Sequence, residues 1–384
     1  MFYLKCLFLL LAWLGQVKLG ITVINRYIVF LRDTILKHLL TLGFGLLMIS
    51  WIPFGILSGA ADELAPLPPE NWKEAILLFF LLFGIFLYLK ASFTSLKVYI
   101  HNPFPGAVTG HHSETLHPEK SDNWRSPRFP LFPETYFNAF NDYYSLEINT
   151  YKIRCKSLPE SFRGFRIGHI SDLHCDGRLD ERFYEYCISR LNDLKPDIVF
   201  VTGDHISRRK YTPYVSDILA EIRSLHGAYI LRGNHDFWEK DDRMKKEFRE
   251  KGLTILDNIS LLISQAEDRI RIAGVEHPWN RMKNWDKRLF ADDDIFTLCV
   301  THTPDNFIRA AAAGAFLTLC GHTHGGQIRI PFYGPVICPS RFSRKFDQGF
   351  FEQDGRLLYV NRGIGSTVPL RVRCPSEIAL FILR

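Results

Sequence analysis

The sequence lacks a strong excess of charge of either sign. It has 47 Lys and Arg residues against 41 Asp and Glu residues, and its formal net charge is +6. Nucleic-acid-binding proteins concentrate positive charge on one surface, so this near balance argues against a large cationic field and we expect no nucleic-acid partner. The composition fits a mildly basic face toward anionic lipid or phosphate.

Paired cysteines and internal repeats are also absent from the sequence. The eight cysteines are scattered and form no CxxC pair, which argues against a zinc ribbon and gives no clear disulfide framework. A chain of 384 residues without a repeat is long enough for one large domain or for two ordinary ones.

Long apolar runs are present, and they gather in the first hundred residues. Residues 39–61 carry no charged side chain, and about 20 apolar residues suffice to cross a bilayer. Residues 75–96 form a second run, in which Lys90 can reach the interface. We therefore predict a membrane anchor at residues 1–100 with about two transmembrane helices. The apolar stretch before residue 32 fits an interfacial helix, a further short span or an uncleaved signal-like segment.

Basic residues around these runs predict the orientation of the chain. They precede the first run and follow the second, whereas residues 61–72 of the connecting loop include none: Lys5, Lys18, Arg26, Arg32 and Lys37 come before, and Lys90 and Lys97 come after. By the positive-inside rule, both flanks then lie in the cytoplasm. We expect a multi-pass protein of a bacterial inner membrane, with its later residues on the cytoplasmic side and the phospholipid bilayer as a partner.

The rest of the chain divides into a linker and a catalytic domain. Residues 101–142 are rich in Pro, His, Ser and Asn and show no sustained periodicity, which predicts a linker. We interpret its histidines (His111, His112 and His117) as solvated rather than as a metal clamp. Residues 143–384 instead alternate short apolar runs with amphipathic stretches such as residues 178–196 and 214–226, which predicts an α/β domain.

The apolar runs of this domain end in polar side chains. In chain order these are Asp172 and His174, then Asp204, then Asn234, His235 and Asp236, then His302, then His322 and His324. Active-site residues collect at the carboxyl ends of the strands in such sheets. We therefore expect these side chains to converge if their strands are neighbours.

The side-chain types indicate a metal site. Carboxylates together with neutral imidazoles favour Mn, Fe, Zn or Co, whereas Mg and Ca prefer oxygen alone. The candidate ligands are too many for one ion and suit two divalent ions that share a carboxylate: Asp172, His174, Asp204, Asn234, His302, His322 and His324. Two ions about 3.5–4 Å apart clamp a phosphoryl group and turn a bridging water into hydroxide near neutral pH. The pattern therefore predicts phosphoester hydrolysis, with manganese as the expected metal.

Five motifs carry these residues in a characteristic order. They are SDLH (171–174), GDH (203–205), GNHD (233–236), THTP (301–304) and GHTHGGQ (321–327). In this order they resemble the calcineurin-like metallophosphoesterases, and the resemblance extends over residues 145–384. It implies a four-layer α/β/β/α sandwich of two mixed sheets, preceded here by the predicted transmembrane helices.

The resemblance also implies a role for each residue. Asp172, His174 and His324 would hold the first metal, Asn234, His302 and His322 would hold the second, and Asp204 would bridge them. His235 would stabilise the phosphoryl oxygens or protonate the leaving oxygen. Asp236 would orient His235 and stabilise its charge.

Three longer segments resemble a membrane-associated subgroup of bacterial phosphodiesterases, which includes the chlamydial type of UDP-2,3-diacylglucosamine diphosphatase. They are residues 158–174, 233–238 and 361–383. The implied substrate is a lipid-linked phosphodiester or diphosphate such as UDP-2,3-diacylglucosamine, cleaved to lipid X and UMP in lipid A biosynthesis. Where most of the subgroup has Asp-rich residues after the strand that ends at Gly274, this chain has Glu276, His277, Pro278 and Trp279.

Arginines at two places are candidates for contacts with substrate phosphate. Arg208 and Arg209 follow Asp204, where a solvated loop is the alternative. Arg362 and Arg371 could present a bidentate fork to phosphate. Two further functions stay open: a broad-specificity membrane-bound phosphodiesterase or nucleotidase, and a non-catalytic membrane scaffold with a structural metal site.

Overall fold

The computed structural model describes residues 82, 86, 104–118, 124, 141–239, 243–279, 286–291, 293–330, 334–335, 337–366, 368 and 370–384. The spans predicted at residues 39–61 and 75–96 therefore lie outside the described residues, apart from Leu82 and Phe86. Within the described part of the chain, no helix combines the length and the apolar character that crossing a membrane requires.

The chain divides into two units. One consists of Met1–Pro103 and Ile330–Ser343, and the other of Phe104–Arg329 and Arg344–Arg384. The second unit contains the two large sheets and all the residues for which we predict a metal-binding role. It begins at Phe104, well before the start at residue 143 that the sequence predicts for the catalytic domain.

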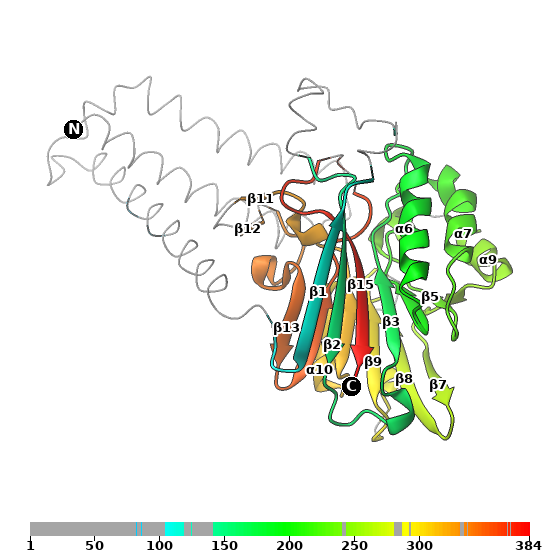
Figure 1. Cartoon of the computed structure of the whole chain (residues 1–384), viewed down its shortest axis with the longest axis vertical. Helices are drawn as coiled ribbons and strands as arrows, with labels where there is room; N and C mark the ends of the chain where they lie inside the picture. Colours follow the sequence, from blue (N-terminus) through cyan, green and yellow to red (C-terminus); the bar gives the residue numbers. More distant parts are fainter. Residues whose placement is uncertain are drawn as a thin grey trace, which may run out of the picture. The chain divides into compact units, whose positions relative to one another are not determined.

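The first large sheet has seven strands in the order β1-β2-β15-β3-β4-β5-β6 (Figure 1). Their bounds are β1 Val108–Leu116, β2 Leu146–Ile153, β15 Ser376–Leu383, β3 Arg166–Ile170, β4 Ile198–Val201, β5 Ala228–Ile230 and β6 Thr254–Ile255. Strands β3 to β6 are parallel, β15 is antiparallel to β3 and parallel to β2, and β1 is an antiparallel edge strand. The sheet is therefore mixed.

The second large sheet has six strands in the order β13-β14-β10-β9-β8-β7. Their bounds are β13 Gly349–Gln353, β14 Arg356–Val360, β10 Leu317–Cys320, β9 Thr297–Thr301, β8 Asp268–Val275 and β7 Ser260–Gln265. The four inner strands are parallel, and β13 and β7 are antiparallel edges. A small separate sheet pairs β11 (Arg329–Ile330) with β12 (Gly334–Pro335).

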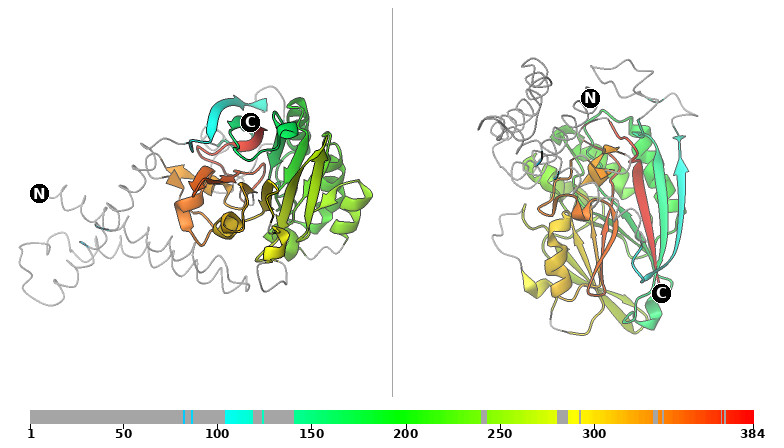
Figure 2. Two further views of the ribbon diagram at one scale, coloured as in Figure 1. Left: turned by 90° about the horizontal axis from the view of Figure 1, so that it is seen from below. Right: turned by 90° about the vertical axis from the view of Figure 1, so that its left-hand side faces the viewer.

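Helices lie on the outer faces of both sheets. The helices α6 (Glu181–Asp193), α7 (Thr212–Ala220) and α9 (Met244–Glu250) lie together beside the first sheet (Figure 1). The helix α10 (Phe307–Ala312) lies with the second sheet (Figure 2). The remaining short helices are α8 Asn234–Trp238, η3 Glu160–Phe162, η4 Arg209–Tyr211, η5 Lys287–Leu289, η6 Pro304–Asn306, η7 His324–Gly326 and η8 Ser343–Phe346.

Strand β4 shows why its sequence is apolar throughout. Val199 and Val201 pack in the core shared with α6, α7 and α9, whereas Ile198 and Phe200 pack in the core shared with the second sheet. A strand that is covered on both faces needs apolar side chains at every position. On the far side of the second sheet, Ala273 and Cys299 pack with Ala310 of α10. The expectation of an α/β fold with two mixed sheets and helices outside them is therefore confirmed.

Strand β1 corrects the prediction of a linker at residues 101–142. It pairs with β2 from Leu116 opposite Leu146 to Val108 opposite Ile153. Edge strands bury little of their surface, and most positions of β1 are exposed, so the strand lacks the apolar alternation by which a sequence reveals a strand.

One predicted linker histidine is likewise part of the sheet. The His111 ring stacks on Tyr151 with ring centroids 4.6 Å apart, and its Nε2 lies 2.9 Å from Asn149 Oδ1. Another, His117, contacts Ser145 Oγ through its Nδ1 at 3.0 Å. These two rings are therefore not simply solvated, as the sequence suggested.

Candidate metal centre

The predicted ligands follow five strands. Asp172 and His174 come after β3, Asp204 after β4 and Asn234 after β5, while His302 comes after β9 and His322 and His324 come after β10. Within each sheet these strands are parallel, and the carboxyl ends of parallel strands meet at one edge. The expected convergence of these side chains is found.

The ligand atoms form three overlapping groups. In each group they lie within 4.8 Å of one another: Asp172, His174 and His324; His174, Asp204 and His235; and Asp204, His302 and His322. The middle group shares His174 with the first and Asp204 with the third. Such an overlap is the arrangement that two ions with a shared carboxylate require.

Asp204 lies between the two outer groups. Its Oδ2 is 3.5 Å from His174 Nε2 and 3.3 Å from His302 Nε2. On one side, His174 Nε2 is 3.0 Å from His324 Nε2. On the other, His302 Nε2 is 3.1 Å from Asn234 Oδ1. The carboxylate can therefore reach toward both groups at once.

The second nitrogens of two of these histidines are held by neighbours. His302 Nδ1 lies 2.7 Å from the carbonyl oxygen of Thr202, so Nδ1 donates and Nε2 is the ring nitrogen that faces Asp204. His174 Nδ1 lies 2.8 Å from Ser207 Oγ. Histidines that bind metals are oriented by such contacts. The donor set and its orientation therefore fit divalent metal ions.

The centre has a negative character. Burial opposes ionisation of Asp172, but charge interactions and a hydrogen bond with the neighbouring histidines keep the pKa of its carboxyl below the ordinary value. Burial also opposes ionisation of Asp204, whose pKa is held well below the ordinary value by His302. Burial lowers the pKa of His322 and of His324 to about 3, whereas that of His302 is raised to about 9, because the charge of Asp204 outweighs burial. The centre therefore holds two buried carboxylates, which favour the binding of cations.

The backbone around the ligands is unusual. Asp172, His174, Asp204, His322 and His324 all have positive φ, between 46° and 71°. Left-handed conformations of residues other than glycine are uncommon and gather at functional sites. They turn the chain sharply at the end of each strand, which brings consecutive polar side chains toward the centre.

A glycine makes room for one of these turns. A Cβ atom on Gly321 would lie 2.1 Å from Asp172 Oδ2 and 2.0 Å from Ser171 Oγ. The same carboxylate accepts a hydrogen bond of 2.5 Å from the Ser171 hydroxyl. Only a residue without a side chain therefore allows the end of β10 to approach Asp172 so closely.

His235 lies at the start of α8, next to the predicted ligands. Its backbone N–H donates to Asp204 Oδ1 at 2.8 Å. Its ring centroid is 4.6 Å from that of His174 and 4.7 Å from that of Trp238. The ring is only partly buried, so it adjoins both the cluster and the surface. This position suits the contact with a bound phosphoryl group that the sequence predicts.

The position of Asp236 corrects the role that the sequence predicts for it. Its Oδ1 accepts from the backbone N–H of His205 at 2.8 Å and of Ile206 at 3.2 Å, and its Oδ2 accepts from that of Gly233 at 2.9 Å. These contacts join the loop after β4 to the start of α8. Asp236 therefore positions the backbone on which His235 stands, rather than orienting the His235 ring directly.

The two C-terminal arginines are buried, which corrects the prediction that they contact substrate. Arg362 Nη2 pairs with Glu147 Oε1 at 2.6 Å and lies 3.3 Å from Glu377 Oε1. Arg371 is 0% exposed, and its guanidinium donates to backbone carbonyls. A guanidinium that is enclosed in this way cannot reach a phosphate. Both arginines instead hold the C-terminal segment in place.

The arginines after Asp204 remain accessible. Arg208, Arg209 and Lys210 are exposed, and their segment adjoins the centre because it follows Ser207, which contacts His174. The backbone N–H of Arg209 donates to Glu239 Oε2 at 2.8 Å. The structure is therefore compatible with the predicted phosphate contact of Arg208 and Arg209.

The loop after β8, where this chain departs from the subgroup, also borders the centre. The Trp279 ring lies 5.4 Å from the ring of His322. Glu276 is buried and pairs with Arg232, with Nε 3.0 Å from Oε1. Arg232 immediately precedes the GNHD motif, so this hydrogen bond links the loop to α8. The local sequence does not predict the contact between Arg232 and Glu276, because the two residues are 44 positions apart.

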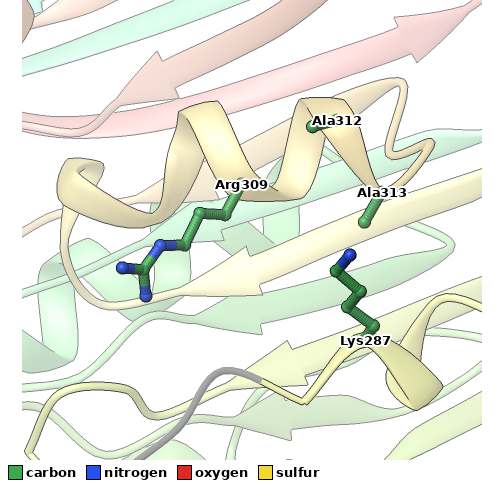
Figure 3. A pocket seen from close by; sticks show the side chains of 4 residues that line it. All are labelled: Lys287, Arg309, Ala312 and Ala313. Atoms are coloured by element: carbon green, nitrogen blue, oxygen red, sulfur yellow. The ribbon is translucent and has the colours of Figure 1, made fainter.

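A cavity of about 380 Å³ lies at a different place, against α10. It is lined by Lys287, Arg309, Ala312 and Ala313 (Figure 3). None of the predicted site residues lines it. Two exposed cations on short helices make this hollow basic, but they do not connect it to the metal centre.

Comparison with known proteins identifies similar chains. A family model described as calcineurin-like phosphoesterase matches residues 165–326. YkuE of Bacillus subtilis (strain 168), an uncharacterized metallophosphoesterase, is 30% identical over 246 residues, which cover 62% of this chain and 86% of YkuE. The phosphodiesterase YaeI of Escherichia coli (strain K12) is 25% identical over 225 residues, which cover 57% of this chain and 82% of YaeI.

A third relative has a named lipid substrate. The UDP-2,3-diacylglucosamine pyrophosphatase LpxG of Chlamydia trachomatis serovar D is 25% identical to this chain over 295 residues. The aligned part covers 59% of this chain and 86% of LpxG.

Proposed function

This chain is a hydrolase of the calcineurin-like phosphoesterase family, and we propose that it cleaves phosphodiester or diphosphate bonds with the help of two divalent metal ions. The observation that carries the proposal is the overlap of the three ligand groups at His174 and Asp204. One compact group would suit a single structural ion, whereas linked groups suit a pair.

The proposed ligands are those that the family resemblance implies. Asp172, His174 and His324 would hold one ion, Asn234, His302 and His322 the other, and Asp204 would contact both. When bound, divalent ions polarise phosphoryl oxygens and lower the pKa of coordinated water. The protein itself holds the donor atoms in place. The carbonyl of Thr202 orients the His302 ring, and the hydroxyl of Ser207 orients the His174 ring.

We propose that His235 stabilises the phosphoryl oxygens or donates a proton to the leaving oxygen. The ring adjoins His174 and is partly exposed, so it can reach a phosphoryl group bound at the ions. The variant His235→Ala should then lower kcat about 10² to 10⁴-fold while it leaves the metal content unchanged. Metal analysis and steady-state kinetics on one preparation test both points. Full hydrolysis by a variant that still binds its metals would show that the assignment is wrong.

We propose a lipid-linked diphosphate as the substrate, with UDP-2,3-diacylglucosamine as the specific candidate. The similarity to LpxG and the predicted transmembrane spans support this choice. The test is incubation of the purified full chain with Mn²⁺ and this substrate, with release of UMP and lipid X as the readout. If simple aryl phosphodiesters are cleaved and no UMP appears, the chain is instead a phosphodiesterase of broader specificity.

We further propose that residues 1–100 anchor the hydrolase domain to the cytoplasmic face of the membrane, with spans at 39–61 and 75–96. The support is the charge distribution around the apolar runs. The full chain should stay with membranes after extraction at alkaline pH. Protease added to intact spheroplasts should leave the domain that begins at Phe104 uncut, and its digestion there would contradict the orientation.

A further inference from the structure

Trp238 is a large aromatic side chain at the end of α8, and 49% of it is exposed. A single exposed aromatic residue is common on protein surfaces and by itself indicates little. The contacts of Trp238, however, connect it to the metal centre. Its ring centroid lies 4.7 Å from that of His235 at an interplanar angle of 54°. The indole is therefore in ring contact with the residue for which we propose a role at the leaving oxygen.

The position of His235 relates Trp238 to a bound substrate. The His235 ring also contacts the His174 ring, so it is a common neighbour of the metal centre and of the indole. A group attached to the leaving oxygen must lie beside His235 if His235 donates a proton to that oxygen. The exposed part of Trp238 is then an aromatic surface that such a group can meet.

Positive charge accompanies the indole. The exposed residues Arg208, Arg209 and Lys210 lie on a segment that is tied to the end of α8 by the bond from the Arg209 N–H to Glu239 Oε2. Glu239 directly follows Trp238. The same segment is tied to the metal centre by Ser207. Indole and cations therefore border the centre together, and we call this surface, Ser207–Lys210 with Trp238 and Glu239, the rim.

We propose that the rim determines the choice of leaving group: Trp238 stacks against a planar aromatic leaving group, and the cations of the rim favour one that carries negative charge. A nucleoside monophosphate combines both properties. Stacking on an aromatic side chain accepts any base, and Arg or Lys near the ring attracts the phosphate. This inference rests on the proposed function, because it needs His235 to face the leaving oxygen.

The test compares two soluble phosphodiesters in the full chain loaded with Mn²⁺. One has an aryl leaving group and the other a fluoroalkyl leaving group of matched acidity, so that intrinsic reactivity does not separate them. In Trp238→Leu, kcat/KM should fall about tenfold, which is about 1.4 kcal/mol, for the aryl ester and less than twofold for the alkyl ester. Trp238→Phe keeps a planar ring and should recover most of the loss. Leu225→Ala, at a site that is 78% exposed and outside the rim, is the matched control.

The cations of the rim are tested with a second pair of esters. Both have aryl leaving groups, and one of these carries an additional carboxylate. In Arg208→Gln, kcat/KM should fall about threefold to tenfold more for the anionic leaving group than for the neutral one. The difference should shrink at high ionic strength, because exposed charges are screened by salt.

Three results would overturn the assignment of Trp238. An equal loss for both esters means that the indole only supports His235. No loss for either ester means that the leaving group does not touch the indole. A loss confined to substrates embedded in anionic vesicles means that Trp238 contacts the membrane interface.

A binding measurement separates this inference from the proposed function. If the wild type cleaves neither of these esters nor UDP-2,3-diacylglucosamine, the proposed function fails. Titration of the metal-loaded chain with phenylphosphonate and methylphosphonate then tests the rim without turnover. Trp238→Leu should weaken the binding of phenylphosphonate about tenfold relative to that of methylphosphonate, and equal binding changes would contradict the role of the indole.

Discussion

Arg371 offers a direct test of how the C-terminal segment supports the metal centre. The side chain is 0% exposed. Its guanidinium donates to the backbone carbonyls of Arg362 at 3.0 Å, Gly363 at 3.2 Å, Gly365 at 2.7 Å and Cys374 at 3.2 Å. Replacement by Met keeps an unbranched apolar stem and removes every one of these donors.

The expected loss of stability follows from the carbonyls that Met would leave without a donor. The Gly363 carbonyl also accepts from the Glu377 N–H at 3.1 Å, so it keeps a partner. The other three lose the donor described here, and a buried polar group without a partner costs about 1 kcal/mol or more. Burial of the charged guanidinium is unfavourable and lowers the pKa of Arg371. Removal of this charge therefore offsets a part of the loss. We therefore expect Arg371→Met to lower the free energy of unfolding by about 2 to 3 kcal/mol.

The Arg371→Met substitution should also weaken metal binding at the centre. The backbone N–H of Gly365 donates to the carbonyl of Asp172 at 2.8 Å, and that of Ile364 donates to the carbonyl of Ser171 at 2.9 Å. The loop that Arg371 holds is therefore bonded to the segment that carries a predicted ligand. Weaker positioning of Asp172 should reduce the affinity for the metals in the variant.

Thermal unfolding measures the first effect and metal titration the second. For a domain of this size, about 1 kcal/mol corresponds to about 2–4 °C in Tm, so we expect a decrease of about 4–12 °C. Arg373→Met is the matched control, because Arg373 lies on the same segment and is exposed. A decrease in Arg371→Met no larger than in this control would refute the reasoning.

Two further perturbations test the centre and the loop beside it. Gly321→Ala places a methyl group against Ser171 and Asp172, so metal analysis should show loss of an ion while the circular dichroism of the variant stays that of a folded chain; full metal content would contradict the close approach. Burial raises the pKa of Glu276 from 4.5 to about 8, and a hydrogen bond with Asp257 raises it further. The folded chain therefore holds this proton more tightly than the unfolded chain, and the stability due to Glu276 is present below pH 4.5 and lost as the pH rises to about 8. Urea midpoints measured across this range should fall with pH from this cause, and Glu276→Gln should flatten the slope; an unchanged slope would contradict the buried, protonated carboxyl.

The sequence predicts the part of the site that is local in the chain. Each predicted ligand stands within a few residues of an apolar run, as Asp172 does after β3 and His302 after β9. The end of a buried strand is visible in a single sequence, because apolar residues stop where the chain leaves the core. The order of the motifs then adds the family, and with it the two mixed sheets.

The sequence does not reveal features that depend on distant partners. Arg362 and Glu147 are 215 positions apart, and no local pattern distinguishes a buried arginine from one that awaits a phosphate. Asp236 is similar, since its partners His205 and Ile206 lie on another loop. Strand β1 was not predicted for a different reason. Its contacts are local to the sheet edge, but an exposed edge strand lacks the apolar alternation that reveals a strand in a sequence.

The two kinds of feature depend on each other at the metal centre. Asp172 and His174 adopt left-handed backbone conformations. These conformations are unfavourable, and contacts within the local segment do not compensate for them. Compensating contacts come from the loop after β4, whose carbonyls accept from the Asp172 and His174 N–H groups, and from the C-terminal loop, through the Ile364 and Gly365 N–H groups and, behind them, Arg371. A chain that kept every motif but lost this loop would keep its ligands and lose their arrangement. The motifs therefore identify the chemistry, whereas the affinity for metals should depend equally on residues that no motif contains.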